Sequence, residues 1–260
     1  MRPVALSIAG SDPSGGAGLQ ADLKTFHQFG VYGEAVVTLI TVQNTRVVNR
    51  VECLSADIVI AQICAVLEDI PPAAIKTGAL GNAEIVRAIA GLTFACPLVV
   101  DPVMISKHGA PLVAADARDA ITRCLLPRAT LLTPNLHEAA ALTGESVEDV
   151  AGMRRAAARI CEMGCKSALV KGGHLSGSAV DILYHEGSWH EFEAPRTVTP
   201  HTHGTGCTYS AAITAGLASG WNLVDAVGRA KRYITRAIET NPGLGAGSGP
   251  VNHHAEVDQR

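Results

Sequence analysis

The sequence predicts an α/β protein in which a mostly parallel β-sheet is covered by helices. Short runs of Val, Ile and Leu alternate along the chain with helix-like segments, the pattern of repeated βαβ units. The composition agrees, because 47% hydrophobic and only 17% charged residues suit an aliphatic sheet buried between Ala-rich helices. No linker, low-complexity tract or internal repeat divides the 260 residues. We therefore expect one domain over residues 1–260.

The expected elements follow one another in this alternating order. Apolar runs predict strands over 4–9, 35–42, 47–54, 73–77, 98–101, 131–133 and 168–171. Residues 56–70 carry apolar side chains at three- and four-residue spacing, which is typical of a helix with one buried face. Helices are also expected over 19–28, 83–90, 115–124, 150–162, 209–217 and 223–239. Residues 182–184 and 189–192 predict a hairpin at a sheet edge, and 243–249 an irregular tail.

Charge and hydropathy exclude several classes of protein. No apolar stretch approaches the roughly 18 residues that a membrane span needs, and the amino terminus does not resemble a signal peptide, so we expect a cytoplasmic protein. The formal charge is -3 and basic residues are not concentrated in any window, which argues against a nucleic-acid partner. Seven scattered cysteines are expected to be reduced thiols rather than a disulfide framework.

Two glycine-rich turns are candidate ligand sites, because ligands of open parallel sheets bind beyond the carboxyl ends of the strands. The first turn, residues 10–18, follows the first strand and opens a helix. Its backbone N–H groups are placed to hold a small ring or an anion. It lacks the Lys-Ser/Thr of a P-loop, and glycine is also needed there for a tight turn on steric grounds alone. Both interpretations stay open at this point.

The second turn, residues 203–208, stands immediately before an expected helix and contains Cys207. The N–H groups of Thr205, Gly206 and Cys207 should point at one spot, where the helix dipole adds positive charge and favours an anion. The same position should lower the pKa of the Cys207 thiol, so that it can accept a proton from a substrate hydroxyl. The alternative is a buried structural cysteine, but the flanking glycines favour the functional role.

Polar side chains after two other strands could complete a phosphate site. Asn135 and Glu138, at an i, i+3 spacing, would share one helix face and could hold the water shell of Mg²⁺. The alternative is a helix cap formed by the same two residues. Lys171 ends the next strand and could reach phosphate oxygens.

Taken together, these motifs resemble the ribokinase-like superfamily, and within it the hydroxymethylpyrimidine/phosphomethylpyrimidine kinases of thiamine synthesis. The resemblance covers nearly the whole chain and includes six motifs in order, at residues 9–26, 43–45, 101–104, 133–136, 170–174 and 202–208. It implies a three-layer fold with a central sheet between helices, a homodimer, and MgATP as the donor to two successive acceptors. The hydroxymethyl group of the pyrimidine is phosphorylated first, and the resulting monophosphate second.

The resemblance also implies a role for individual residues. Cys207 matches the proposed base, and Gly204, Thr205 and Gly206 match the turn that neutralises the transferred phosphoryl group. Gln43 would bind the aminopyrimidine edge, in a ring pocket lined by Gly10, Asp12, Ala17, Ala79 and Val103. The nucleotide would be bound by Asn135, Lys171 and Thr205, and Mg²⁺ by Asn135, Glu138 and Asp101 through water.

One departure from the family pattern touches specificity. Relatives usually carry methionine where this chain has Ala79, and the smaller side chain is expected to enlarge the ring pocket. Pyridoxal, which also carries a hydroxymethyl group, is therefore an alternative substrate.

Two rival functions follow from the same residues. Cys207 with His203 or His201 could form a thiol hydrolase or transferase, although such close spacing around a turn seldom places imidazole on sulfur. A catalytically silent binding module of the same fold is the second rival. The pair Cys161 and Cys165 and the pair His253 and His254 are not expected to bind metal, and both histidines of the second pair are expected to be exposed.

Overall fold

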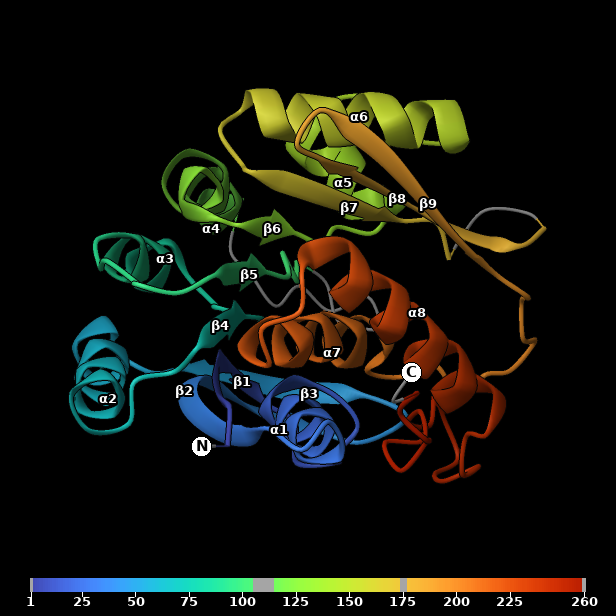
Figure 1. Ribbon diagram of the computed structural model, residues 1–260. Helices are drawn as coiled ribbons and strands as arrows, with labels where there is room; N and C mark the ends of the chain where they lie inside the picture. Colours follow the sequence, from blue (N-terminus) through green and yellow to red (C-terminus); the bar gives the residue numbers. More distant parts are fainter. Residues whose placement is uncertain (1, 105–114, 174–176, 259–260) are drawn as a thin grey trace.

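A nine-stranded sheet forms the centre of the computed structural model, which describes residues 2–104, 115–173 and 177–258 (Figure 1). The strand order is β3-β2-β1-β4-β5-β6-β7-β8-β9. The bounds are β1 Val4–Ser11, β2 Tyr32–Gln43, β3 Val48–Cys53, β4 Ala74–Thr77, β5 Leu98–Val100, β6 Leu131–Leu132, β7 Ser167–Lys171, β8 Ala179–His185 and β9 Ser188–Ala194. The pairs from β2 through β7 are parallel, and β3, β8 and β9 pair antiparallel. The predicted parallel sheet with an edge hairpin is confirmed.

Helices cover both faces of the sheet and make the predicted three layers (Figure 1). One face carries α1 Gly18–Gln28, α7 Thr205–Ala218 and α8 Leu223–Glu239. The other carries α2 Ala56–Asp69, α3 Ala83–Ala90, α4 Ala115–Ala120, α5 Leu136–Thr143 and α6 Val150–Glu162. Strand β5 is apolar at every position because helices cover both of its faces. Leu98 and Val100 pack against the face that carries α2 to α6, whereas Val99 packs against the face that carries α1, α7 and α8.

Three helical segments differ from the predicted elements. The expected helix over 115–124 is α4 followed by a π-helical turn, η1 Ile121–Leu125, and a 3₁₀ turn, η2 Leu126–Arg128. Helix α5 was not predicted, although its capping residues were. Helix α7 begins at Thr205, four residues before the predicted start, because low propensity in Thr-Gly-Cys-Thr is overridden by packing.

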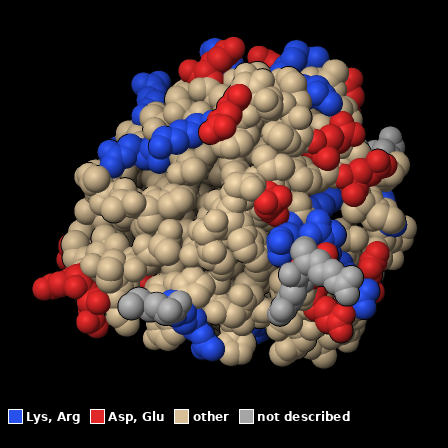
Figure 2. All heavy atoms as spheres, viewed as in Figure 1, with Lys and Arg blue, Asp and Glu red and all other residues tan. Residues whose placement is uncertain are grey.

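Charged side chains of both signs gather around the rim of the face in Figure 2, and its left and central part is mostly uncharged. None of the helices in the described ranges has the length and apolar character needed to cross a membrane. The tail after α8 is irregular, as predicted, and folds back so that Pro250 pairs with His203. The tail therefore braces the second glycine-rich turn.

Candidate active site

Every predicted site residue lies around one cavity of about 660 Å³ at the carboxyl ends of the parallel strands. The predicted residues in its lining are Gly10, Asp12, Ala17, Gln43, Ala79, Asp101, Val103, Asn135, Glu138, Lys171, Gly204, Thr205, Gly206 and Cys207. They come from the end of β1 and the turn after it, from the loops after β4, β5 and β6, from the ends of β2 and β7, and from the starts of α5 and α7. The sheet topology thus gathers motifs that are up to 197 residues apart in the chain.

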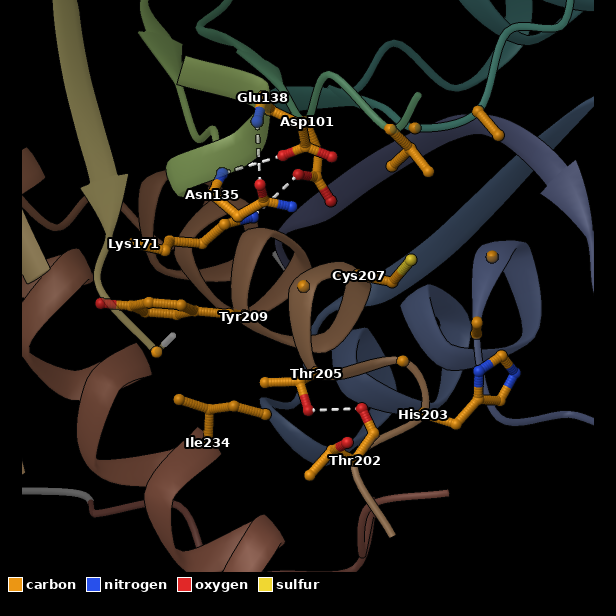
Figure 3. Close-up of a pocket in the computed structure, with 18 of the residues that line it drawn as sticks. Asp101, Asn135, Glu138, Lys171, Thr202, His203, Thr205, Cys207, Tyr209 and Ile234 are labelled. Atoms are coloured by element: carbon orange, nitrogen blue, oxygen red, sulfur yellow. Dashed lines mark hydrogen bonds and ion pairs between the residues drawn. The ribbon is translucent and has the colours of Figure 1, made fainter. Parts of the chain in front are cut away.

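The start of α7 is set by Gly204, which precedes the helix with φ of 78°. A side chain there would be strained, and its Cβ would also collide with the carbonyl oxygen of Gly16. Thr205 donates both its N–H (3.3 Å) and its hydroxyl (2.7 Å) to the carbonyl oxygen of Thr202 (Figure 3). The prediction that three amides point at one spot is therefore wrong for Thr205. Gly206 and Cys207 supply the first-turn N–H groups that have no acceptor within an α-helix.

The Cys207 thiol is half-buried and leaves α7 on the side opposite Lys171 (Figure 3). It shares the cavity with Gln43, so it is not a cysteine of the apolar interior. The expectation of a lowered pKa is wrong, because burial raises the pKa of Cys207 to about 11. Lys76 works in the opposite direction, but the carboxylates of Asp22 and Asp101 add to the rise. The resting thiol is therefore protonated at neutral pH.

Lys171 and Asp101 form an ion pair next to the helix start, with Nζ 3.1 Å from Oδ1 (Figure 3). Burial favours the neutral acid, yet the ammonium groups of Lys171 and Lys76 hold the pKa of Asp101 below its ordinary value. A Cβ built on Gly206 would lie 3.4 Å from Lys171 Nζ, so the ammonium group adjoins the first-turn amides of α7. Positive charge and N–H donors thus meet where a phosphoryl group would be neutralised.

Asn135 and Glu138 form the capping box of α5, so the predicted alternative that these two residues cap a helix is confirmed. Asn135 Oδ1 accepts from the Glu138 N–H at 2.9 Å, and Glu138 Oε2 accepts from the Asn135 N–H at 2.8 Å. Burial raises the pKa of Glu138 to about 7, with Asp101 adding to the rise and Lys171 opposing it. Both side chains also line the cavity. Within the described ranges, no three His, Cys, Asp or Glu side chains are grouped so that they could hold a metal ion.

The first glycine-rich turn is filled by its own aspartate. Asp12 Oδ1 accepts from the Ser14 N–H and hydroxyl, at 2.8 and 2.7 Å, and Oδ2 accepts from the N–H groups of Gly16 and Ala17, at 3.2 and 2.9 Å. Burial works against ionisation, but hydrogen bonds from His203, Ser14 and Gln43 hold the pKa of Asp12 far below its ordinary value. The turn therefore does not offer these amides to an external anion, so this part of the ligand-binding interpretation is wrong.

Several residues at the site escaped sequence reasoning. Lys76 Nζ lies 2.5 Å from Asp22 Oδ1, with both side chains fully buried, and Lys76 contributes to the cavity. A lone lysine inside the apolar strand Ala74–Thr77 was the available signal. Leu39 and Thr41 line the cavity from the face of β2 that also carries Gln43, and Tyr209 and Ile234 line its other end (Figure 3). The alternation of side chains along β2 shows that Leu39, Thr41 and Gln43 share one face of the strand, but it does not show that this face lines the cavity.

The histidines do not have the positions that a thiol hydrolase would require. His203 Nε2 is bonded to Asp12 Oδ2 at 2.8 Å, so its imidazole is not a base directed at the sulfur of Cys207. The expectation that His253 is exposed is wrong, because it is only 7% exposed and its Nε2 is bonded to Thr208 Oγ1 at 3.1 Å. The hydroxyl of Thr208, on the second turn of α7, needs this partner inside the protein.

A three-layer α/β sheet with an amide-bearing helix start, a lysine and buried carboxylates around one cavity defines a ribokinase-like small-molecule kinase. Comparison with known proteins narrows this class. A family model described as phosphomethylpyrimidine kinase matches residues 12–252. A hydroxymethylpyrimidine/phosphomethylpyrimidine kinase of Streptomyces coelicolor is 48% identical over 253 residues, which is 96% of this chain and 94% of the relative. The chain belongs to the phosphomethylpyrimidine kinase family.

Solved structures show the same fold. A phosphomethylpyrimidine kinase from Clostridium difficile is 44% identical with a TM-score of 0.81, over 91% of this chain and all of that chain. An ADP complex of Bacillus subtilis pyridoxal kinase is 37% identical with a TM-score of 0.89, over 98% of both chains. Both neighbours are named as kinases of a small ring compound, a pyrimidine in one and pyridoxal in the other.

Proposed function

We propose that this protein transfers the γ-phosphoryl group of ATP first to 4-amino-5-hydroxymethyl-2-methylpyrimidine and then to its monophosphate, yielding the diphosphate used in thiamine synthesis. The observation that carries the proposal is the meeting of Cys207, Lys171 and the first-turn amides of α7 in the cavity that also contains Gln43. Family membership supports the choice of acceptor. We further propose that the reaction takes place in the cytoplasm.

Charge neutralisation dominates the proposed mechanism, because phosphoryl transfer through a loose transition state needs positioning more than covalent help. The transferred group would lie at the N–H groups of Gly206 and Cys207, beside the Lys171 ammonium. The pyrimidine would lie between Gln43 and the residues of the first turn, with Ala17 and Val103 against the ring. This arrangement places the acceptor oxygen on the Cys207 side of the phosphoryl group.

Cys207 has a proton to remove only in the first reaction. The hydroxymethyl oxygen must lose its proton as it is phosphorylated, whereas the acceptor oxygen of the monophosphate is already anionic. The thiolate of Cys207 would act as general base in the first step and be dispensable in the second. The thiol is protonated at rest, so only the small ionised fraction would act at neutral pH.

Magnesium fits the oxygen donors at the nucleotide end of the cavity. Mg²⁺ prefers carboxylate oxygens and water, and the cavity presents the carboxylates of Asp101 and Glu138 beside Asn135. We propose that these three residues hold the ion through water. It would supply charge neutralisation at the nucleotide phosphates, as metal ions do in kinases generally. The ADP complex of the pyridoxal kinase neighbour supports a nucleotide at this site.

A coupled assay of ADP release distinguishes the proposal from its alternatives. Hydroxymethylpyrimidine, its monophosphate and pyridoxal would be compared as acceptors, at equal concentration and with saturating MgATP. We expect turnover with both pyrimidines, and slower turnover with pyridoxal. Faster turnover with pyridoxal would favour the alternative that Ala79 widens the ring pocket for that substrate. Turnover with none of the three acceptors would contradict the kinase function itself.

We also propose that the protein is a homodimer. Leu39, Thr41 and Gln43 line the cavity from one face of β2, and the opposite face carries Ile40 and Val42, which are 49% and 52% exposed. Exposed apolar side chains on an edge ribbon indicate a protein contact. Light scattering after size-exclusion chromatography tests this. A dimer that Val42→Glu converts to monomers supports it, and a monomeric wild type refutes it.

A further inference from the structure

The two glycine-rich turns touch each other, although 191 residues separate Asp12 from His203. A Cβ on Gly204 would meet the carbonyl oxygen of Gly16, and a Cβ on Gly16 would lie 2.6 Å from His203 Cδ2. The proposed substrate side and the proposed phosphate side of the cavity therefore share a direct van der Waals contact. Any shift of one turn relative to the other changes the distance between acceptor and donor sites.

One hydrogen bond joins the two turns through two buried polar side chains. Asp12 and His203 are 2% and 7% exposed, and Asp12 Oδ2 lies 2.8 Å from His203 Nε2. An ionised carboxylate only accepts, so Nε2 carries the proton and donates. Within its own turn Asp12 accepts from Ser14, Gly16 and Ala17, and the Gln43 amide at the end of β2 also donates to it. Asp12 thus organises the first turn, and His203 connects that turn to the second glycine-rich turn.

His203 is itself anchored directly before the helix start. Its N–H donates to the Gly249 carbonyl oxygen at 3.0 Å, and its carbonyl oxygen accepts from the Val251 N–H at 3.3 Å. The next residue, Gly204, has the left-handed conformation from which α7 begins. The position of the imidazole is therefore coupled to the direction in which the Gly206 and Cys207 amides point.

We infer that Asp12 and His203 form a positioning pair that holds the substrate-side turn at a fixed distance from the amides of α7. The inference rests on the proposed kinase function, and neither residue is assigned contact with the reacting atoms. In-line transfer requires a near-attack arrangement, and a misplacement of about 1 Å costs roughly 100-fold in rate. Because both phosphorylations use the same alignment, loss of the pair should slow both. Loss of a base at Cys207 should slow only the first.

The test compares His203→Gln with His203→Asn. A Gln amide nitrogen can reach the position of Nε2 and donate to Asp12, whereas the shorter Asn side chain cannot. The matched control is His253→Asn, which removes the buried Thr208 hydrogen bond one turn further along α7. For each variant, kcat and KM for both pyrimidines and ATP are measured well below the melting temperature, which is recorded separately.

We expect His203→Asn to lose about 100-fold in kcat for both acceptors, with KM for ATP changed less than about threefold. His203→Gln should recover at least about tenfold of that loss. His253→Asn should lower the melting temperature while keeping kcat within about threefold of wild type. The inference is overturned if His203→Asn keeps wild-type kcat, loses it for one acceptor only, or is matched by His253→Asn. An inactive wild type would instead overturn the proposed function, and the inference with it.

Discussion

The pH dependence of the two half-reactions is the sharpest consequence of the raised pKa of the Cys207 thiol. Because the pKa of Cys207 is about 11, its thiolate fraction is about 10⁻⁴ at pH 7 and about 10⁻² at pH 9. If the thiolate is the base, kcat/KM for hydroxymethylpyrimidine should rise about tenfold per pH unit over this range. The monophosphate needs no base and is already a dianion above pH 7, so its kcat/KM should not show this rise.

The assay follows ADP release with each acceptor between pH 7 and pH 9.5 at saturating MgATP. The readout is the ratio of the two kcat/KM values, since titration of Glu138 or of the nucleotide affects both half-reactions alike and cancels. We expect this ratio to rise about 100-fold from pH 7 to pH 9. In Cys207→Ala the rise should disappear, and the first step at pH 9 should fall by about 10² to 10⁴ while the second changes little. A flat ratio in the wild type, or equal losses in the two steps of Cys207→Ala, would refute the reasoning.

Three further substitutions test other parts of the site. Lys171→Met should reduce kcat by about 10² to 10³ with both acceptors, and a loss below tenfold in steady-state kinetics would argue against phosphate contact. Gly204→Ala should destabilise the protein more than Gly220→Ala, because both positions have positive φ but only the first is obstructed by backbone; equal midpoints in urea would contradict this. Lys76→Met leaves the Asp22 carboxylate buried and should cost about 3 to 5 kcal/mol of unfolding free energy in the same titration, whereas Lys76→Met with Asp22→Asn should recover much of that loss.

Much of the fold was predictable because the signals that define it are local. The apolar run at 98–101 and the periodic residues of 56–70 indicate a strand and a helix without knowledge of their partners. Helix α5 was missed because three consecutive alanines leave Leu136 and Leu142 as its only large apolar residues, too few to show a helical period. The equally short α3 was predicted because Ile85, Val86 and Ile89 show that period. The start of α7 was misplaced because it depends on the fit of Gly204 against Gly16, which are 188 residues apart.

The amino-acid sequence by itself determined the α/β class and the strands that the motifs follow. It also grouped the candidate residues into one site. The class follows from local periodicity, and the gathering of the turns follows from the rule that loops after parallel strands converge at one edge. The place of Gln43, Ala79 and Val103 in the ring pocket came from the family resemblance. Only the tertiary structure decided how the site is charged and what each turn can bind. Burial and neighbouring carboxylates keep Cys207 protonated where the helix dipole alone predicts a thiolate, and the Asp12 carboxylate fills the turn that appeared open to an anion. Desolvation and hydrogen-bond satisfaction depend on groups distant in the chain, so no local pattern contains them.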